Sequence, residues 1–221
     1  MARSRGVQRA GAEAACRQVA SWSVDNPGLS VSINVSQRQL RRPEFGAEVG
    51  SVLARTGIEP SRIALEITES MLMLDPGRAQ AVLERLSRIG LTLSVDDFGT
   101  GYSSLANLKR LPVDVIKIDK SFVMDMAIDA SDAAIVRSTI DLAHNLGLRV
   151  VAEGVESHQA WTRLTELGCD LAQGFYVSRP LPAADLGRLL RERTAAAAEQ
   201  AAEAMAADAP PTLRVISARA S

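Results

Sequence analysis

The sequence contains few cysteines, no excess of either charge and no long apolar run, and each absence excludes a class of protein. Among its 221 residues, Cys16 and Cys169 are the two cysteines and match no CxxC spacing, so neither a disulfide framework nor a thiolate zinc site is indicated. The 25 Lys and Arg nearly balance the 26 Asp and Glu, so no overall field attracts the chain to DNA or to an anionic membrane. No apolar run approaches the roughly 20 residues of a membrane span.

The N-terminal residues also lack the marks of an export signal. Residues 1–16 include basic side chains but no apolar core of the kind that a signal peptide carries. With two unpaired cysteines, this predicts a cytoplasmic protein, long enough for one sizeable core. We expect a disordered arm over 1–11, a folded domain over 12–192, and an Ala-rich tail over 193–221 that is helical and then disordered.

Six short runs rich in β-branched and aliphatic residues alternate with segments of helical spacing. We expect strands at 29–36, 62–70, 91–99, 113–121, 148–156 and 169–177. The helical segments include 78–90 and 133–147, and both stop at a glycine suited to a helix C-terminus. This alternation indicates a parallel sheet covered by helices, either a doubly wound sheet or a β/α barrel.

Polar residues near the carboxyl ends of all six strands favour the barrel. They are Asn34, Glu66, Asp96 with Asp97, Lys117, Glu153 and Gln173. In a barrel these ends converge on one mouth, whereas in an open sheet they would spread along an edge. A full eight-stranded barrel needs about 250 residues, and the repeating pattern here occupies only about 25–180. We therefore predict an α/β fold, a modified TIM-like (β/α) barrel with about six of its eight strands.

The four acids in this set would repel one another in one mouth unless cations neutralised them. Oxygen ligands select Mg²⁺, Mn²⁺ or Ca²⁺ over zinc, and Asn34 and Gln173 add neutral amide oxygens. Two ions about 3.5 to 4 Å apart would suit displacement at phosphorus, with Lys117 orienting the water or offsetting charge on the phosphate. A structural ion pair would explain any one acid alone, but four on successive strands favour a metal site.

Two other functions are compatible with parts of this pattern. The segment 99–104, "GTGYSS", resembles a dinucleotide-binding turn, with Asp119 about 20 residues further on. However, Ser104 replaces the third glycine, and a pyrophosphate would meet the two aspartates before the turn, so a contact loop or lid is favoured. Lys117 inside a strand could instead form a Schiff base, which borohydride would trap, but such a site would not need so many carboxylates.

Several further residues have both a structural and a functional interpretation. Glu69 lies three residues after Glu66 and is either a helix N-terminal acid or an anchor for a neighbouring loop. Glu156 likewise lies three residues after Glu153 and has the same two interpretations. The residues at 102–104 could form an ordinary turn and helix cap.

Six segments in order along the chain resemble the EAL-domain phosphodiesterases. They are "NVS" at 34, "EITE" at 66, "DDFGTGYSS" at 96, "KID" at 117, "EGVE" at 153 and "QGFYVSRP" at 173, and the likeness covers about 12–185. Members of this family are bacterial enzymes that hydrolyse cyclic di-GMP to linear pGpG on a modified β/α barrel. The resemblance therefore implies a cyclic di-GMP phosphodiesterase that uses one or two Mg²⁺ or Mn²⁺ ions.

The resemblance also implies roles for single residues. The implied metal ligands are Asn34, Glu66, Asp96, Asp97 and Glu153. Lys117 is implied to assist the attacking water, with Asp97 and Glu153 also catalytic. The implied supporting or substrate residues are Glu69, Glu156, Gln173 and Asp119. Glu69 would steady the loop Phe98, Gly99, Thr100, Gly101, Tyr102, Ser103 and Ser104, which helps to form a homodimer in the family through the region 97–105.

One motif of the family is absent from these residues. The segment Glu-Ala-Leu-Leu-Arg, which supplies a ligand glutamate and a phosphate-binding arginine on a strand upstream of "NVS", does not occur. "GAEAAC" at 11–16 falls in the expected helix, so Glu13 is not a substitute. We expect the chain to be poorly active or inactive, with open strand edges that invite pairing with a partner. The alternatives are a non-catalytic cyclic di-GMP receptor, an interaction module, or a start codon further upstream.

Overall fold

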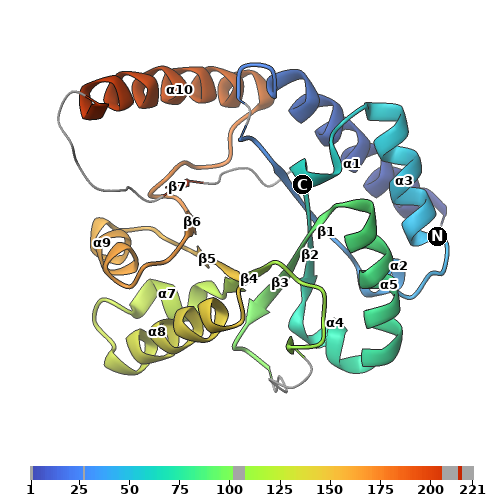
Figure 1. Cartoon of the computed structure of the whole chain (residues 1–221), viewed down its shortest axis with the longest axis horizontal. Coiled ribbons are helices and arrows are strands. Elements are labelled where there is room, and N and C mark those ends of the chain that lie inside the picture. The colour runs from blue at the N-terminus through green and yellow to red at the C-terminus, as the bar shows by residue number, and fades with distance from the viewer. Residues whose placement is uncertain (1, 27, 102–107, 206–213, 216–221) are drawn as a thin grey trace.

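The computed structural model describes residues 2–26, 28–101, 108–205 and 214–215, and in this part of the chain seven parallel strands form one sheet (Figure 1). Each strand pairs with the next along the chain. The strands are β1 (Val31–Asn34), β2 (Ile63–Thr68), β3 (Thr92–Phe98), β4 (Val115–Ile118), β5 (Arg149–Glu153), β6 (Leu171–Gln173) and β7 (Arg214–Val215). β1 to β6 fall inside the six predicted runs and form a curled half-barrel, so the prediction of an incomplete β/α barrel is confirmed.

Helices connect the strands and surround the sheet (Figure 1). They are α1 (Ala2–Trp22), α2 (Gln37–Leu40), α3 (Phe45–Thr56), α4 (Glu69–Leu74), α5 (Pro76–Ile89), α7 (Lys120–Asp125), α8 (Ala130–Asn145), α9 (His158–Glu166) and α10 (Ala183–Met205), with a 3₁₀ turn at Pro60–Arg62. In the described residues, no helix combines the length and apolar content that crossing a bilayer requires.

Local sequence signals set several helix ends. Asp75, Asp129 and Ser157 each accept a hydrogen bond from a backbone N–H in the first turn of α5, α8 and α9, respectively. These bonds satisfy donors that have no partner inside the helix. Gly57 and Gly90 end α3 and α5 in the left-handed conformation. Short connections then direct the chain into the next strand.

The two faces of the sheet have different environments. Ile116 and Val150 belong to the main apolar core, while the alternate residues Val115, Val151 and Leu171 form a separate, smaller cluster. Successive strand residues point to opposite faces, so this smaller cluster lies on the inner face. Two residues further along the same strands come Lys117, Glu153 and Gln173. The inner face thus carries an apolar layer and, next to it at the strand ends, a polar one.

Two described elements lie in the terminal stretches of the chain. α1 begins at Ala2, within the stretch 1–11, and this extension agrees with the good helix formers Ala, Arg and Gln in the sequence there. β7 lies in the expected disordered tail and pairs with β6, Leu171 opposite Arg214 and Ala172 opposite Val215. The edge strand of a sheet has backbone N–H and C=O groups without partners in the sheet. β7 pairs with the edge of β6.

Candidate functional site at the strand ends

Lys117 of β4 lies at the centre of three carboxylates from three other strands. Its Nζ is 2.8 Å from Glu66 Oε1, 3.0 Å from Asp96 Oδ1 and 2.6 Å from Glu153 Oε1. The lysine side chain is only 2% exposed. We call Glu66, Asp96, Asp97, Lys117 and Glu153 the strand-end cluster. In these contacts one ammonium group faces three carboxylates. The negative charge of the carboxylates therefore exceeds the positive charge of Lys117.

Two opposing effects determine the charge state of Lys117. Burial alone would lower its pKa, because desolvation disfavours the ammonium form. The neighbouring carboxylates of Glu66, Glu153 and Asp96 outweigh that effect, and the pKa of Lys117 is raised above its usual value. Lys117 is therefore a charged ammonium group, which a Schiff-base nucleophile must not be before it attacks a carbonyl. This argues against the aldolase-like alternative.

Asp96 and Asp97 contribute to the same site although they are adjacent in a strand. Regular alternation would direct their side chains to opposite faces. The register between β3 and β4 shifts between Val95 and Phe98, and Asp97 has a φ of 55°. With this irregularity, one carboxylate oxygen each of Asp96, Asp97 and Glu153 lie within 4.8 Å of one another.

This arrangement fits a hard divalent cation. Three carboxylate oxygens converge at the mouth, and oxygen donors are the ligands that Mg²⁺, Mn²⁺ and Ca²⁺ prefer. In addition, Glu66 Oε2 is buried and has no hydrogen-bond partner in the described part of the chain. A buried carboxylate oxygen without a partner is costly, and a cation beside it would remove that cost.

Glu69 contacts the loop that follows the paired aspartates. Its side chain is buried, and its Oε2 accepts a hydrogen bond of 3.0 Å from the backbone N–H of Gly99. A Cβ at Gly101 would lie 2.7 Å from Glu69 Oε1, so any larger residue there would displace the carboxylate. The predicted loop residues Tyr102, Ser103 and Ser104 lie outside the described residues.

The remaining predicted site residues occupy different positions around the cluster. Asn34 is exposed at the end of β1 and is in register with Glu66. Gln173 of β6 is in register with Glu153. Asp119 caps α7 by accepting a 2.9 Å hydrogen bond from Ser121 N. Glu156 is exposed, and its side chain makes no ion pair or hydrogen bond with the described residues.

The pKa of Asp119 depends on this capping position. Partial burial alone would raise the pKa, because desolvation disfavours the carboxylate. The hydrogen bonds from the side chain and backbone of Ser121 lower it, with smaller contributions from Lys120 and from a hydrogen bond with Asp97, and the net pKa is below the usual value. The lowered pKa favours the ionised form of Asp119.

The sequence interpretation missed two features of the inner face. It assigned neutralisation of the acids to metal ions, whereas Lys117 itself contacts three of them. It also overlooked Ser94, whose buried Oγ has no partner among the described residues and which is in register with Glu66. Counting back two residues from Asp96 would have placed Ser94 on the same face.

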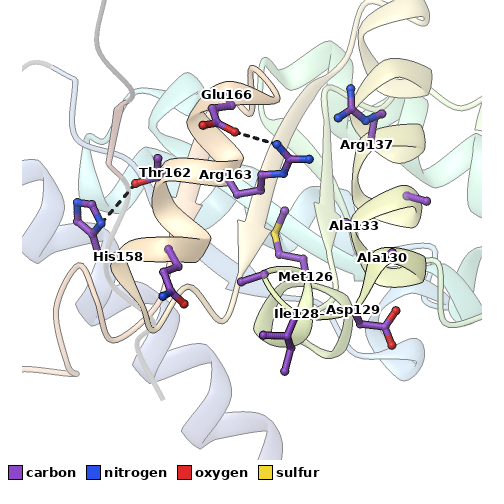
Figure 2. A pocket seen from close by; sticks show the side chains of 13 residues that line it. Met126, Ile128, Asp129, Ala130, Ala133, Arg137, His158, Thr162, Arg163 and Glu166 are labelled. Atoms are coloured by element: carbon purple, nitrogen blue, oxygen red, sulfur yellow. Dashed lines mark hydrogen bonds and ion pairs between the residues drawn. The ribbon is translucent and has the colours of Figure 1, made fainter.

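A groove in the described residues lies elsewhere, between α8 and α9. This groove has a volume of about 900 Å³ and its lining includes Met126, Ile128, Arg137, His158, Arg163 and Glu166. Figure 2 shows its polar side chains on the helices, with Arg163 paired to Glu166. None of the described residues lining it belongs to the strand-end cluster. The groove is therefore separate from the strand-end cluster.

A parallel β/α half-barrel with converging carboxylates at its strand ends places the chain among the β/α barrel proteins, whose active sites lie at this mouth. The family model described as "EAL domain" matches residues 4–180. The chain belongs to the EAL domain family.

Relatives of known structure agree with this assignment. The bifunctional diguanylate cyclase/cyclic di-GMP phosphodiesterase MucR of Pseudomonas aeruginosa is 43% identical over 173 residues, which are 78% of this chain and 25% of MucR. The PaMucR phosphodiesterase in complex with c-di-GMP has a TM-score of 0.76 at 43% identity, covering 79% of this chain and 71% of that one. The manganese/cy-diGMP complex of Klebsiella pneumoniae BlrP1 has a TM-score of 0.68 at 31% identity, and the match covers 76% of this chain and 43% of the BlrP1 chain. The chain spans about a quarter of the length of the curated relatives it matches.

Proposed function

We propose that this chain is a cyclic di-GMP phosphodiesterase domain that forms linear pGpG, with weak activity in a polypeptide limited to these 221 residues. The convergence of Asp96, Asp97 and Glu153 beside Lys117 carries the proposal. Support also comes from the c-di-GMP complex of PaMucR and the manganese complex of BlrP1. Because Asp96, Asp97 and Glu153 are oxygen donors, we assign Mg²⁺ or Mn²⁺ as the cofactor.

The proposed reaction uses the residues of the strand-end cluster. Divalent ions bound by Asn34, Glu66, Asp96, Asp97 and Glu153 would stabilise negative charge and lower the pKa of water. The ammonium group of Lys117 donates hydrogen bonds to the attacking water or to a phosphate oxygen, and Asp97 or Glu153 accepts the proton that the water loses. The water oxygen bonds to phosphorus, the bond from phosphorus to the 3′ oxygen breaks, and that oxygen takes up a proton.

The weak activity follows from the missing Glu-Ala-Leu-Leu-Arg segment. Glu13 does not replace its glutamate, because it lies on α1 and pairs with Arg17 and with Arg55, at 2.8 Å from Arg55 Nη2. Removing one carboxylate ligand lowers metal affinity, since affinity depends on the number of charged ligands. β1 pairs only with β2 in the described residues, and we propose either a homodimer through the region 97–105 or a partner that covers this open edge. Light scattering on the purified chain tests for a homodimer.

Product formation tests the proposal directly. The full chain is incubated with Mn²⁺ and cyclic di-GMP, and pGpG is measured by anion-exchange chromatography. We expect slow formation of pGpG, lost in Asp97→Asn and unchanged in Glu166→Gln, an exposed acid of the groove. Binding without pGpG would instead identify a receptor, and turnover equal to that of a full-length relative would contradict the weak activity.

A further inference from the structure

Ser94 of β3 carries a buried hydroxyl group on the inner face of the sheet. The residue is 3% exposed, and its Oγ has no hydrogen-bond partner among the described residues. It lies two residues before Asp96 on the same strand, so the two side chains point to the same face. A buried hydroxyl without a hydrogen bond is costly. Ser94 therefore requires a partner that the described side chains do not provide directly.

The carboxylate of Glu66 has a second oxygen in the same situation. Its Oε1 is 2.8 Å from Lys117 Nζ, whereas its Oε2 is buried and has no hydrogen-bond partner in the described part of the chain. Glu66 of β2 is in register with Ser94, and neighbouring strands are about 4.8 Å apart. The two side chains therefore leave the inner face side by side and at the same level.

The ion pair with Lys117 determines the direction of the Glu66 side chain. β3 lies between β2 and β4 in the sheet, so Glu66 on β2 reaches Lys117 on β4 by crossing the inner face of β3. Ser94 and Asp96 are residues of β3 on that face, and Asp96 Oδ1 is also 3.0 Å from Lys117 Nζ. The carboxylate of Glu66 therefore lies over β3, close to the hydroxyl of Ser94.

Lys117 has no donor left for the second oxygen of Glu66. An ammonium group has three N–H donors, and three carboxylate oxygens surround this one, from Glu66, Asp96 and Glu153. The hydrogen bond that Glu66 Oε2 requires must come from another group. The hydroxyl of Ser94 is the neighbouring donor on β3.

We propose that a buried water molecule joins Ser94 Oγ to Glu66 Oε2 and so holds the Glu66 carboxylate in place for a divalent cation. The Ser94 hydroxyl donates to the water, and the water donates to Oε2. Buried waters commonly bridge polar groups that would otherwise lack partners. Ser94 is thus a positioning residue, because it acts on the cation through Glu66. This inference rests on the proposed function, which assigns Glu66 as a metal ligand.

The affinity for Mn²⁺ tests the role of Ser94 with no nucleotide present. Electron paramagnetic resonance on the full chain measures the Kd from the signal of the free ion. Ser94→Ala removes the hydroxyl, and we expect the Kd to rise by roughly 10-fold, as it does when a group that orients a metal ligand is lost. Ser94→Thr keeps a hydroxyl and should restore most of the affinity. The matched control Thr139→Val removes another buried hydroxyl, on α8, and should leave the Kd unchanged.

A high-resolution crystal structure of the full chain tests the water itself. We expect one water within hydrogen-bond distance of both Ser94 Oγ and Glu66 Oε2 in the wild type. In Ser94→Ala the water should be lost and the Glu66 carboxylate should change its orientation. A wild-type structure without this water would overturn the proposal. Thermal unfolding of each variant without metal confirms that the fold is retained.

Parallel measurement of pGpG separates this proposal from the phosphodiesterase activity. Weaker Mn²⁺ binding by Ser94→Ala, with no pGpG formed by the wild type, would support the role of Ser94 and contradict the phosphodiesterase. Formation of pGpG by the wild type, with an unchanged Mn²⁺ Kd in Ser94→Ala, would overturn the role of Ser94 alone. A wild-type chain that binds no Mn²⁺ would overturn both.

Discussion

The strand-end cluster and the groove between α8 and α9 contain similar charged side chains in opposite circumstances. In the cluster, Lys117 is 2% exposed and contacts carboxylates from three other strands. In the groove, Arg163 and Glu166 are 43% and 57% exposed and lie three residues apart on one helix (Figure 2). The first arrangement exists only after the strands assemble, whereas the second needs a single helix.

The two sets of charges differ in their solvation by water. An exposed pair is solvated and screened, so its net contribution is about 0 to 1 kcal/mol. A buried set has lost its hydration and depends on its partners, so removal of one partner costs about 3 to 5 kcal/mol. The buried cluster therefore holds the larger electrostatic energies, and a cation placed there interacts strongly.

Removal of the central lysine should produce the largest effect. In Lys117→Met, three carboxylates lose their shared cation, and we expect a loss of about 3 to 5 kcal/mol in the free energy of unfolding with EDTA present. Added Mn²⁺ should restore part of it. Urea denaturation measures both. Arg137→Met in the groove is the matched control, and its free energy of unfolding should change by no more than about 0.5 kcal/mol. Equal effects of the two substitutions would show that the buried cluster is not more sensitive to loss of a charge than the exposed groove.

The sequence predicted the elements of this cluster better than its geometry. Apolar runs alternating with helical segments located β1 to β6, because buried parallel strands require such runs. Polar residues at the strand ends indicated that Glu66, Asp96 and Glu153 would meet at the mouth. Asp97 was expected at the same mouth, but the register shift and the positive φ that accompany its position there were not predictable from local sequence.

Long-range contacts explain the other omissions. The position of Lys117 among three carboxylates depends on the relative register of four strands, which no local pattern encodes. β7 was missed because a two-residue strand is defined only by its neighbour, β6.

Metal binding should distinguish the strand-end cluster from the groove almost as clearly as Lys117→Met does. An ion that binds only the folded chain stabilises it by about 2.7 kcal/mol at a concentration 100 times its Kd. We expect Mn²⁺ to raise the midpoint of thermal unfolding of the wild type and to have little effect on Asp97→Asn. Glu166→Gln should respond as the wild type does. A full Mn²⁺ response in Asp97→Asn would place the ion elsewhere.

The contact between Glu69 and Gly99 should have an intermediate effect. Glu69→Ala leaves the Gly99 N–H without its acceptor, and we expect a loss of about 1 to 3 kcal/mol. Glu69→Gln keeps an oxygen that can accept the hydrogen bond, so its loss should be smaller. Hydrogen exchange of the Gly99 amide reports the contact directly. Unchanged exchange in Glu69→Ala would mean that the carboxylate does not hold the loop.

The smallest effect should come from the ion pair in the groove. A double-mutant cycle of Arg163→Ala and Glu166→Ala should give a coupling energy of about 0.2 to 0.5 kcal/mol, and it should decrease further in high salt because exposed charges are screened. The same cycle on Lys117 and Glu153, measured by urea denaturation in EDTA, should give a larger coupling that salt changes little. If both pairs had the same coupling energy and salt dependence, burial would not be the cause of the difference between the two regions.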